Sequence, residues 1–324
     1  MSDLLRAQDV YVSFYTAKET VRVLNGFSFS VQPGDIIGLV GESGSGKSVA
    51  ISAMIALLGK TGKIDSGEIL FKGQNVLALN EEQLRDLRCR EIGVIPNNPK
   101  GMLHPIVPIG TQLENRYRSA HPTAKKEQAR ARAIQALEMV QIPDPVKRLA
   151  VLPGELSGGM AQRVLIAMAL INEPNLVIAD DATTGLDVTV QSQILDLIEA
   201  QVQRTGSAAV MVTHDLGIVA QYCKKVAILC MGKIVEASDS VEELLHNAAH
   251  PYTRTLLSAT PGVPRKYEPW VDPPKAAHMA IPAEGCILQH RCRNCRQECL
   301  RSQPGKTEVA PGHWVDCCAA GEVK

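Results

Sequence analysis

Apolar residues in the first 40 positions follow the short periodicities of β-strands. Asp9–Phe14, Thr20–Leu24 and Phe27–Val31 combine β-branched and aromatic residues with partial alternation. Ile36–Val40 follows the turn at Pro33–Asp35 and is a continuous apolar run, which is typical of a strand buried on both faces. The pattern predicts an antiparallel β layer followed by one buried strand.

Helical periodicity dominates the middle of the chain, where apolar strands recur between the helices. Strands are predicted at Leu176–Ala179 and Ala209–Thr213. Strands that alternate with helices indicate an α/β fold with a mainly parallel sheet. Helices are predicted at Ser48–Leu58, Glu81–Arg90, Thr123–Val140, Ala161–Leu170 and Gln191–Gln203.

The periodic pattern fades after His246. Prolines recur through the following stretch, and six of the nine cysteines lie between Cys286 and Cys318. We therefore predict one domain over residues 1–246, with a helical subdomain at about 97–172, and a small cysteine-rich extension over 247–324.

Composition excludes several classes of function. Lysine plus arginine total 34 and aspartate plus glutamate total 34, so the net charge is zero, and aromatic residues make up only 4%. Neither value favours nucleic-acid binding, which needs a basic face or stacking rings. No apolar run approaches the ~18–20 residues that cross a bilayer, and the first ten residues lack a secretory pattern. We expect a cytoplasmic protein.

A glycine-rich segment, GESGSGKS at Gly41–Ser48, follows the buried strand and precedes a predicted helix. This spacing matches the phosphate-binding loop, in which backbone N–H groups and a helix N-terminus face the phosphates. Lys47 would reach the terminal phosphates and Ser48 would ligate Mg²⁺. We expect nucleotide contacts from Gly41, Ser43, Gly44, Ser45, Gly46, Lys47, Ser48 and Val49.

Two aspartates and a histidine follow later strands. Asp180 ends an apolar run and would hold Mg²⁺ through water. Asp181 is placed to orient or deprotonate an attacking water, although a helix cap or turn is the simpler alternative. His214 ends the next strand and could contact the terminal phosphate, whereas an isolated histidine at a strand end is more often structural.

The segment LSGGMAQR at Leu156–Arg163 resembles the signature motif of the ABC ATPases. The resemblance implies a P-loop NTPase fold and a head-to-tail pair of ATP-binding subunits. In that pair Ser157, Gly158 and Gly159 bind the γ-phosphate on the partner's phosphate loop, and Asp187 also lies at the nucleotide.

The chain is similar, more narrowly, to the oligopeptide, dipeptide and nickel importer ATPases. It shares GESGSGKS, IPDP at Ile142–Pro145, the pattern DVT.Q.QI at Asp187–Ile194, and HPYT at His250–Thr253. The resemblance implies a subunit on the cytoplasmic face of the membrane that couples ATP hydrolysis to the uptake of di- or oligopeptides. Its partners would be a second ATPase subunit, two permease subunits and an extracellular binding protein.

Two residues depart from the family pattern. The family has glutamate where this chain has Asp181, and glutamine where it has Asn97, which would also approach Mg²⁺. Each side chain is one methylene shorter, and a displacement of ~1 Å can cost ~10²-fold in rate. We hypothesise a slow ATP site; the alternative is a backbone shift that compensates. Tyr15 and Phe14 both remain candidates for stacking on the adenine.

The spaced cysteines predict a metal centre. Thiolates at such spacings can bind an iron–sulfur cluster or zinc, and unligated or disulfide-bonded cysteines are the alternative. Similarity to importers with a [4Fe–4S] cluster implies the ligands Cys286, Cys292, Cys299 and Cys317, whereas local spacing favours Cys292, Cys295 and Cys299 plus one more.

Three functions remain open from the sequence. The leading one is a transport ATPase for peptides, with nickel or metal chelates as the next cargo. A soluble ABC ATPase in translation or DNA repair would usually have two cassettes or a long coiled-coil insertion. A subunit that binds ATP without hydrolysing it is compatible with Asn97 and Asp181.

Overall fold

The computed structural model describes residues 2–97, 99–182, 188–260, 282 and 284–320. Contacts divide the chain into two compact units. Unit 1 contains Met1–Leu5, Val31–Ile36 and Leu70–Val212, and unit 2 contains Arg6–Ser30, Ile37–Ile69 and Thr213–Lys324. No helix in the described part has the length and apolar character needed to span a bilayer.

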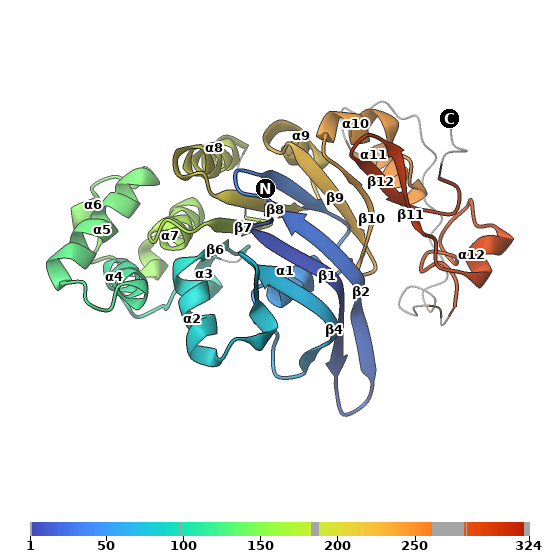
Figure 1. Ribbon diagram of the computed structural model, residues 1–324. Helices are drawn as coiled ribbons and strands as arrows, with labels where there is room; N and C mark the ends of the chain where they lie inside the picture. Colours follow the sequence, from blue (N-terminus) through green and yellow to red (C-terminus); the bar gives the residue numbers. More distant parts are fainter. Residues whose placement is uncertain (1, 98, 183–187, 261–281, 283, 321–324) are drawn as a thin grey trace. The chain divides into compact units, whose positions relative to one another are not determined.

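Unit 1 is built on a parallel group of three strands. β6 (Ile92–Ile95) and β8 (Ala208–Thr213) pair with the two edges of β7 (Leu176–Asp180). All of β8 and the first four residues of β7 are buried, as continuous apolar runs predict. Figure 1 shows the helices of this unit grouped around α7 (Gly158–Leu170), against which α4 and α5 pack. The other helices are η1 (Val76–Ala78), α2 (Glu81–Arg90), α3 (Pro99–Met102), α4 (Ile109–Ala120), α5 (Lys126–Met139), α6 (Pro145–Arg148), η2 (Pro153–Glu155) and α8 (Val188–Thr205).

Unit 2 combines an antiparallel layer with a mixed group of strands. In the first, β1 (Leu5–Tyr15) lies between β2 (Thr20–Val31) and β4 (Gly62–Phe71). The last two residues of β4, Leu70 and Phe71, belong to unit 1, where they pair with β5 (Gln74–Asn75). In the second, β3 (Ile36–Val40) pairs in parallel with β9 (Lys225–Cys230), and antiparallel strands continue through β10 (Lys233–Ser238), β12 (His313–Asp316) and β11 (Lys306–Ala310). The helices are α1 (Lys47–Met54), α9 (Leu216–Tyr222), α10 (Val241–Asn247), α11 (Pro251–Ala259) and α12 (Gln297–Arg301).

The α/β class and the buried strand at Ile36–Val40 are confirmed, and several boundaries are corrected. β2 is continuous through Asn25 and Gly26, where the sequence predicts a break between two strands. Glycine supplies the positive φ that the strand adopts at this point. α1 ends at Met54 instead of Leu58, since Ala56 has a left-handed φ of 49°. The aperiodic C-terminal region contributes helices and two strands. The domain boundaries at residues 97, 172 and 246 stay predictions.

A buried carboxylate joins the C-terminal residues to β10. Glu236 is 1% exposed and accepts hydrogen bonds from the backbone N–H groups of Ala249 (2.6 Å) and His250 (3.2 Å). His313 in β12 lies 2.8 Å from the same carboxylate. Burial lowers the pKa of His313, but hydrogen bonds and charge from Glu236 and Glu243 outweigh it and leave the pKa raised. The cluster fixes α11 and β12 against β10.

His250 begins α11 as a neutral cap. Its Nδ1 accepts a hydrogen bond of 3.0 Å from the N–H of Tyr252, and the side chain is buried. Burial lowers the pKa of His250 to about 4, with Glu236 opposing the shift. Protonation would both bury a charge and remove the acceptor for the helix N-terminus.

We expect the free energy of unfolding of His250→Asn to change less between pH 7 and pH 4 than that of the wild type. The pKa of His250 is depressed in the fold, so its stabilisation is complete above pH about 6.5 and is lost as pH falls towards about 4. The loss is about 3 kcal/mol in free energy of unfolding, whereas asparagine keeps the cap without titrating. Denaturant unfolding between pH 4 and 7 measures both proteins. Parallel profiles would contradict the assignment.

Candidate functional site

The loop at 41–46 carries the predicted phosphate contacts and lies in unit 2. It joins the buried strand β3 to α1. A Cβ at Gly41 would lie 2.3 Å from the carbonyl oxygen of Leu229, so only glycine allows this approach to β9. Gly44 and Gly46 have φ of 82° and 105°, the left-handed conformation that turns the loop into the helix. The conformation of the loop backbone therefore explains why glycine stands at these three positions.

Lys47 is the buried cation of this loop. It is 8% exposed, and its Nζ donates to the carbonyl oxygens of Gly41 (2.7 Å) and Glu42 (3.0 Å). Ser45 is buried, while Ser43, Gly44 and Ser48 are exposed and Val49 is half-buried. An ammonium group beside a glycine-rich loop and a helix N-terminus has the chemistry that binds phosphate.

The predicted carboxylates lie at the carboxyl end of β7 in unit 1. Asp180 is the last residue of the strand, and Asp181 comes directly after it. The N–H of Asp181 donates to the carbonyl oxygen of Val212 (2.8 Å), and its φ is 44°. Aspartate tolerates this left-handed conformation better than most residues because its short side chain can bond locally. The residue type suits a sharp turn at the strand end.

Gln162 is a buried residue of unit 1 that sequence analysis did not single out. It lies on α7, is 1% exposed, and its Nε2 donates to the carbonyl oxygens of Ala182 (2.7 Å) and Pro96 (3.4 Å). These carbonyls belong to the residues next to Asp181 and Asn97. The available signal was a polar residue on the apolar, core-facing side of a helix. Gln162 therefore fixes the backbone beside both predicted catalytic residues.

The predicted signature residues begin α7. Ser157 caps the helix, its hydroxyl accepting a 3.3 Å hydrogen bond from the N–H of Met160. Ser157 and Gly158 are exposed, and a Cβ at Gly158 would meet nothing within 4 Å. At Gly159 the nearest atom would be a methyl carbon of Val190 at 3.7 Å. Packing against the described residues therefore does not require these two glycines.

The remaining predicted residues lie at strand ends. Asn97 is exposed after β6 in unit 1, and His214 is exposed after β8 in unit 2. Tyr15 ends β1, is 47% exposed, and its hydroxyl donates to Asp65 (2.7 Å), which raises the pKa of Tyr15. Asp187 lies outside the described residues.

The predicted iron–sulfur centre is wrong. In the described ranges no group of three or more His, Cys, Asp or Glu side chains is arranged to hold a metal ion. Burial raises the pKa of Cys286 and of Cys292 to about 11 and also raises that of Cys317, while Cys299 is 8% exposed. Burial therefore disfavours the thiolate form of these three cysteines in the fold as it stands.

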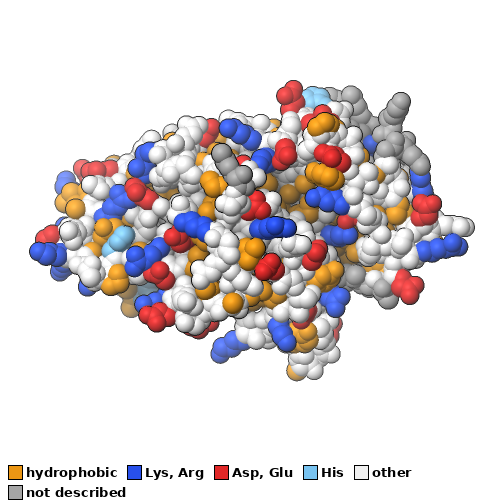
Figure 2. Space-filling model, in the orientation of Figure 1, with side chains coloured by type: hydrophobic (Ala, Val, Ile, Leu, Met, Phe, Trp, Pro, Cys, Tyr) orange, Lys and Arg blue, Asp and Glu red, His pale blue; other side chains and the backbone are white. Residues whose placement is uncertain are grey.

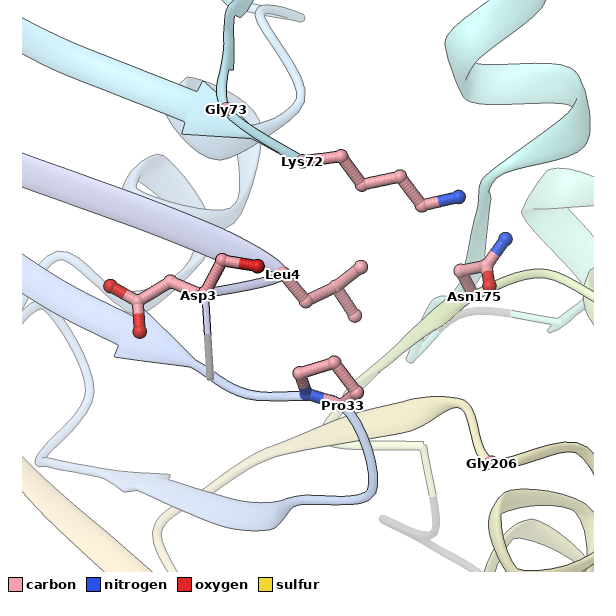
Figure 3. A pocket seen from close by; sticks show the side chains of 8 residues that line it. Asp3, Leu4, Pro33, Lys72, Gly73, Asn175 and Gly206 are labelled. Carbon is pink, nitrogen blue, oxygen red and sulfur yellow. The ribbon is translucent and has the colours of Figure 1, made fainter.

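A pocket of about 260 Å³ in unit 1 is not the candidate site (Figure 3). Asn175 and Gly206, which line it, precede β7 and β8, so it lies at the amino ends of these strands. Ligands of parallel α/β sheets bind at the carboxyl ends, where Asp180 lies. Lysines and arginines are interspersed with aspartates and glutamates on the face in Figure 2, in keeping with the net charge of zero.

Comparisons with known proteins place the chain in a family. Residues 24–184 match the ABC transporter family model, and residues 235–299 match the oligopeptide/dipeptide transporter C-terminal region. A probable peptide ABC transporter ATP-binding protein of Sinorhizobium fredii is 39% identical over 99% of this chain and 96% of its own length. The dipeptide transport ATP-binding protein DppD of Escherichia coli is 37% identical over 97% and 96%.

A solved structure supports the fold. The ATP-binding cassette MJ0796, in a dimeric post-hydrolysis state bound to ADP and Pi, has a TM-score of 0.65 and 26% identity, covering 71% of this chain and 96% of its own. The α/β fold predicted from the sequence is thus the ABC ATPase fold.

We expect Gln162→Leu to lower the kcat for ATP about 10- to 100-fold, because the backbone beside Asp181 and Asn97 loses its donor. Steady-state hydrolysis by the assembled transporter measures it. Gln201→Leu is the matched control: Gln201 is also buried in unit 1, and its Nε2 has no hydrogen-bond partner in the described structure. Equal losses in both variants would show a general packing effect and refute the positioning role.

Proposed function

The chain belongs to the ATP-binding proteins of ABC transporters, and we propose that it powers the uptake of di- or oligopeptides. The supporting observation is the combination of the phosphate loop, the signature helix and the C-terminal region matched by the oligopeptide/dipeptide transporter model. The relatives named for peptide or dipeptide transport match almost the full chain. The reaction is ATP hydrolysis, coupled to transport.

The residues present fit MgATP. Lys47 supplies a buried ammonium group, and a loop rich in glycine and serine leads into the N-terminus of α1. Ser48, Asn97 and Asp180 would hold Mg²⁺ with oxygen ligands, which this cation prefers. The ion supplies charge neutralisation of the phosphates. Tyr15 would stack on the adenine, since its ring is exposed at the end of β1.

The signature residues would act on another subunit. Among the residues that the structure describes, nothing lies within 4 Å of a Cβ at Gly158, so its lack of a side chain suits close approach by another subunit. We propose that Ser157, Gly158 and Gly159 contact the γ-phosphate held by a second ATPase subunit, with Asp187 nearby. That pair, a heterodimer in this proposal, would dock peripherally on two permease subunits at the cytoplasmic face, supplied by an extracellular binding protein. The cysteine-rich extension over residues 247–324 would form an appended module.

We further propose that this chain's own ATP site hydrolyses slowly. Asp181 would be the base, and Asn97 and His214 would contact the water or the γ-phosphate. Asp181 and Asn97 are each one methylene shorter than the family's residue. Asp181 also has a left-handed backbone that favours aspartate over glutamate. Most turnover would then occur at the site completed by this chain's intact signature helix.

Replacing the loop lysine tests nucleotide binding. We expect Lys47→Ala to weaken MgATP binding about 10- to 100-fold, the value of a hydrogen bond to a charged group. Equilibrium titration of the full chain with a fluorescent ATP analogue measures it. Lys60→Ala changes an exposed lysine in the turn that follows the same helix, and this variant should bind within about twofold of wild type. Unchanged affinity in Lys47→Ala would exclude this loop as the site.

Lengthening the carboxylate tests the slow site. We expect Asp181→Glu to raise ATP turnover of the assembled transporter by up to about twofold. The site completed by this chain's signature helix already carries most of the turnover, while a base displaced by ~1 Å slows this chain's own site by up to ~10²-fold. The same change at Asp180 should lower turnover, since it displaces the proposed magnesium ligand. No gain in Asp181→Glu, with Asp180→Glu impaired, would mean that Asp181 does not limit the reaction.

A further inference from the structure

A tyrosine from the C-terminal region is hydrogen-bonded to the phosphate loop. Tyr252, the second residue of α11, is 1% exposed, and its hydroxyl accepts a hydrogen bond of 3.0 Å from the backbone N–H of Glu42. Glu42 lies between Gly41 and Ser43 in the loop. Tyr252 is about 210 positions further along the chain, so the two segments meet only through the fold of unit 2.

The peptide groups of Glu42 connect this tyrosine to the phosphate-binding lysine. The N–H of Glu42 is held by Tyr252, and its carbonyl oxygen accepts from Lys47 Nζ (3.0 Å). Both backbone polar groups of Glu42 are therefore hydrogen-bonded, the N–H to Tyr252 of the C-terminal region and the carbonyl oxygen to Lys47. Loss of the Tyr252 hydroxyl would remove the hydrogen bond that holds Glu42, whose carbonyl oxygen in turn holds Lys47.

Tyr252 is itself held rigidly. Its N–H donates to the neutral cap His250 (3.0 Å), and its hydroxyl also interacts with the buried Cys230 at the end of β9. Burial raises the pKa of Tyr252, so its hydroxyl stays protonated throughout the physiological range. A rigid, buried hydroxyl fixes the position of its partner more precisely than a mobile surface group does.

A second C-terminal residue reaches the side chain of the same loop residue. Arg291 Nη2 lies 3.5 Å from Glu42 Oε2, and the arginine side chain is only 13% exposed. The carboxylate is 40% exposed, so the pair is partly screened by solvent and contributes less than the buried hydrogen bond.

We propose that Tyr252 is a positioning residue for nucleotide binding: it holds the backbone of Glu42 where its carbonyl oxygen accepts from Lys47. Arg291 restrains the Glu42 side chain. This inference rests on the proposed function, since it assumes that MgATP binds at Lys47. Tyr252 acts through Glu42 and does not itself contact the nucleotide.

Tyr252→Phe tests the proposal because it removes only the hydroxyl. One lost hydrogen bond corresponds to about a three- to tenfold weaker affinity for MgATP. Thr253→Val is a matched control: Thr253 is adjacent on α11 and fully buried, and its hydroxyl has no hydrogen-bond partner in the described structure. It should bind within about twofold of wild type. Titration of the full chains with a fluorescent ATP analogue gives these affinities.

Steady-state kinetics of the assembled transporter separate positioning from a general structural effect. Tyr252→Phe should raise the KM for ATP and leave kcat within about twofold, whereas a damaged fold would lower kcat as well. Arg291→Gln should shift affinity in the same direction by less, and its effect should shrink at high salt. Equal effects of Tyr252→Phe and Thr253→Val, or unchanged affinity in Tyr252→Phe, would overturn the proposal.

The Lys47→Ala variant distinguishes failure of this inference from failure of the proposed function. If Lys47→Ala loses affinity while Tyr252→Phe binds as wild type does, nucleotide binding at the loop stands and the positioning role is wrong. If Lys47→Ala also binds normally, the loop is not the nucleotide site, and the positioning role is refuted with it.

Discussion

A buried ammonium group needs acceptors around it, and this constraint organises unit 2. Lys47 is almost fully buried and is held by two backbone carbonyls of its own loop. Those carbonyls are in place because Gly41 packs without a side chain against β9, and because Glu42 is held from behind by Tyr252. The loop is shaped before any phosphate arrives, which is the preorganisation that tight binding favours.

The C-terminal residues take part in this organisation. Strand β12 extends the antiparallel part of the β3 group, and Glu236 ties α11 and His313 to β10. The extension that the sequence predicts over residues 247–324 therefore includes Tyr252, which is hydrogen-bonded to the predicted phosphate loop. A change in this region is expected to alter nucleotide affinity even where no nucleotide contact is lost.

The sequence predicts those parts of the fold whose residues are determined by their own segment of the chain. Ile36–Val40 was predicted with its observed bounds because a strand buried on both faces must be continuously apolar. The glycine–lysine loop could be predicted because its conformation dictates its residues. The roles of Gln162 and Tyr252 could not, because each depends on carbonyl or N–H groups distant in sequence. The iron–sulfur prediction failed for a related reason: cysteine spacing along the chain does not fix thiolate geometry or charge.

The measurement that tests the account most directly is an experimental structure of the assembled transporter with a non-hydrolysable ATP analogue and Mg²⁺. The account predicts a triphosphate in contact with Lys47 of this chain and with the signature serine of the other ATPase subunit. A triphosphate bound away from Lys47, or an assembly whose two ATPase subunits do not enclose it, would contradict the account.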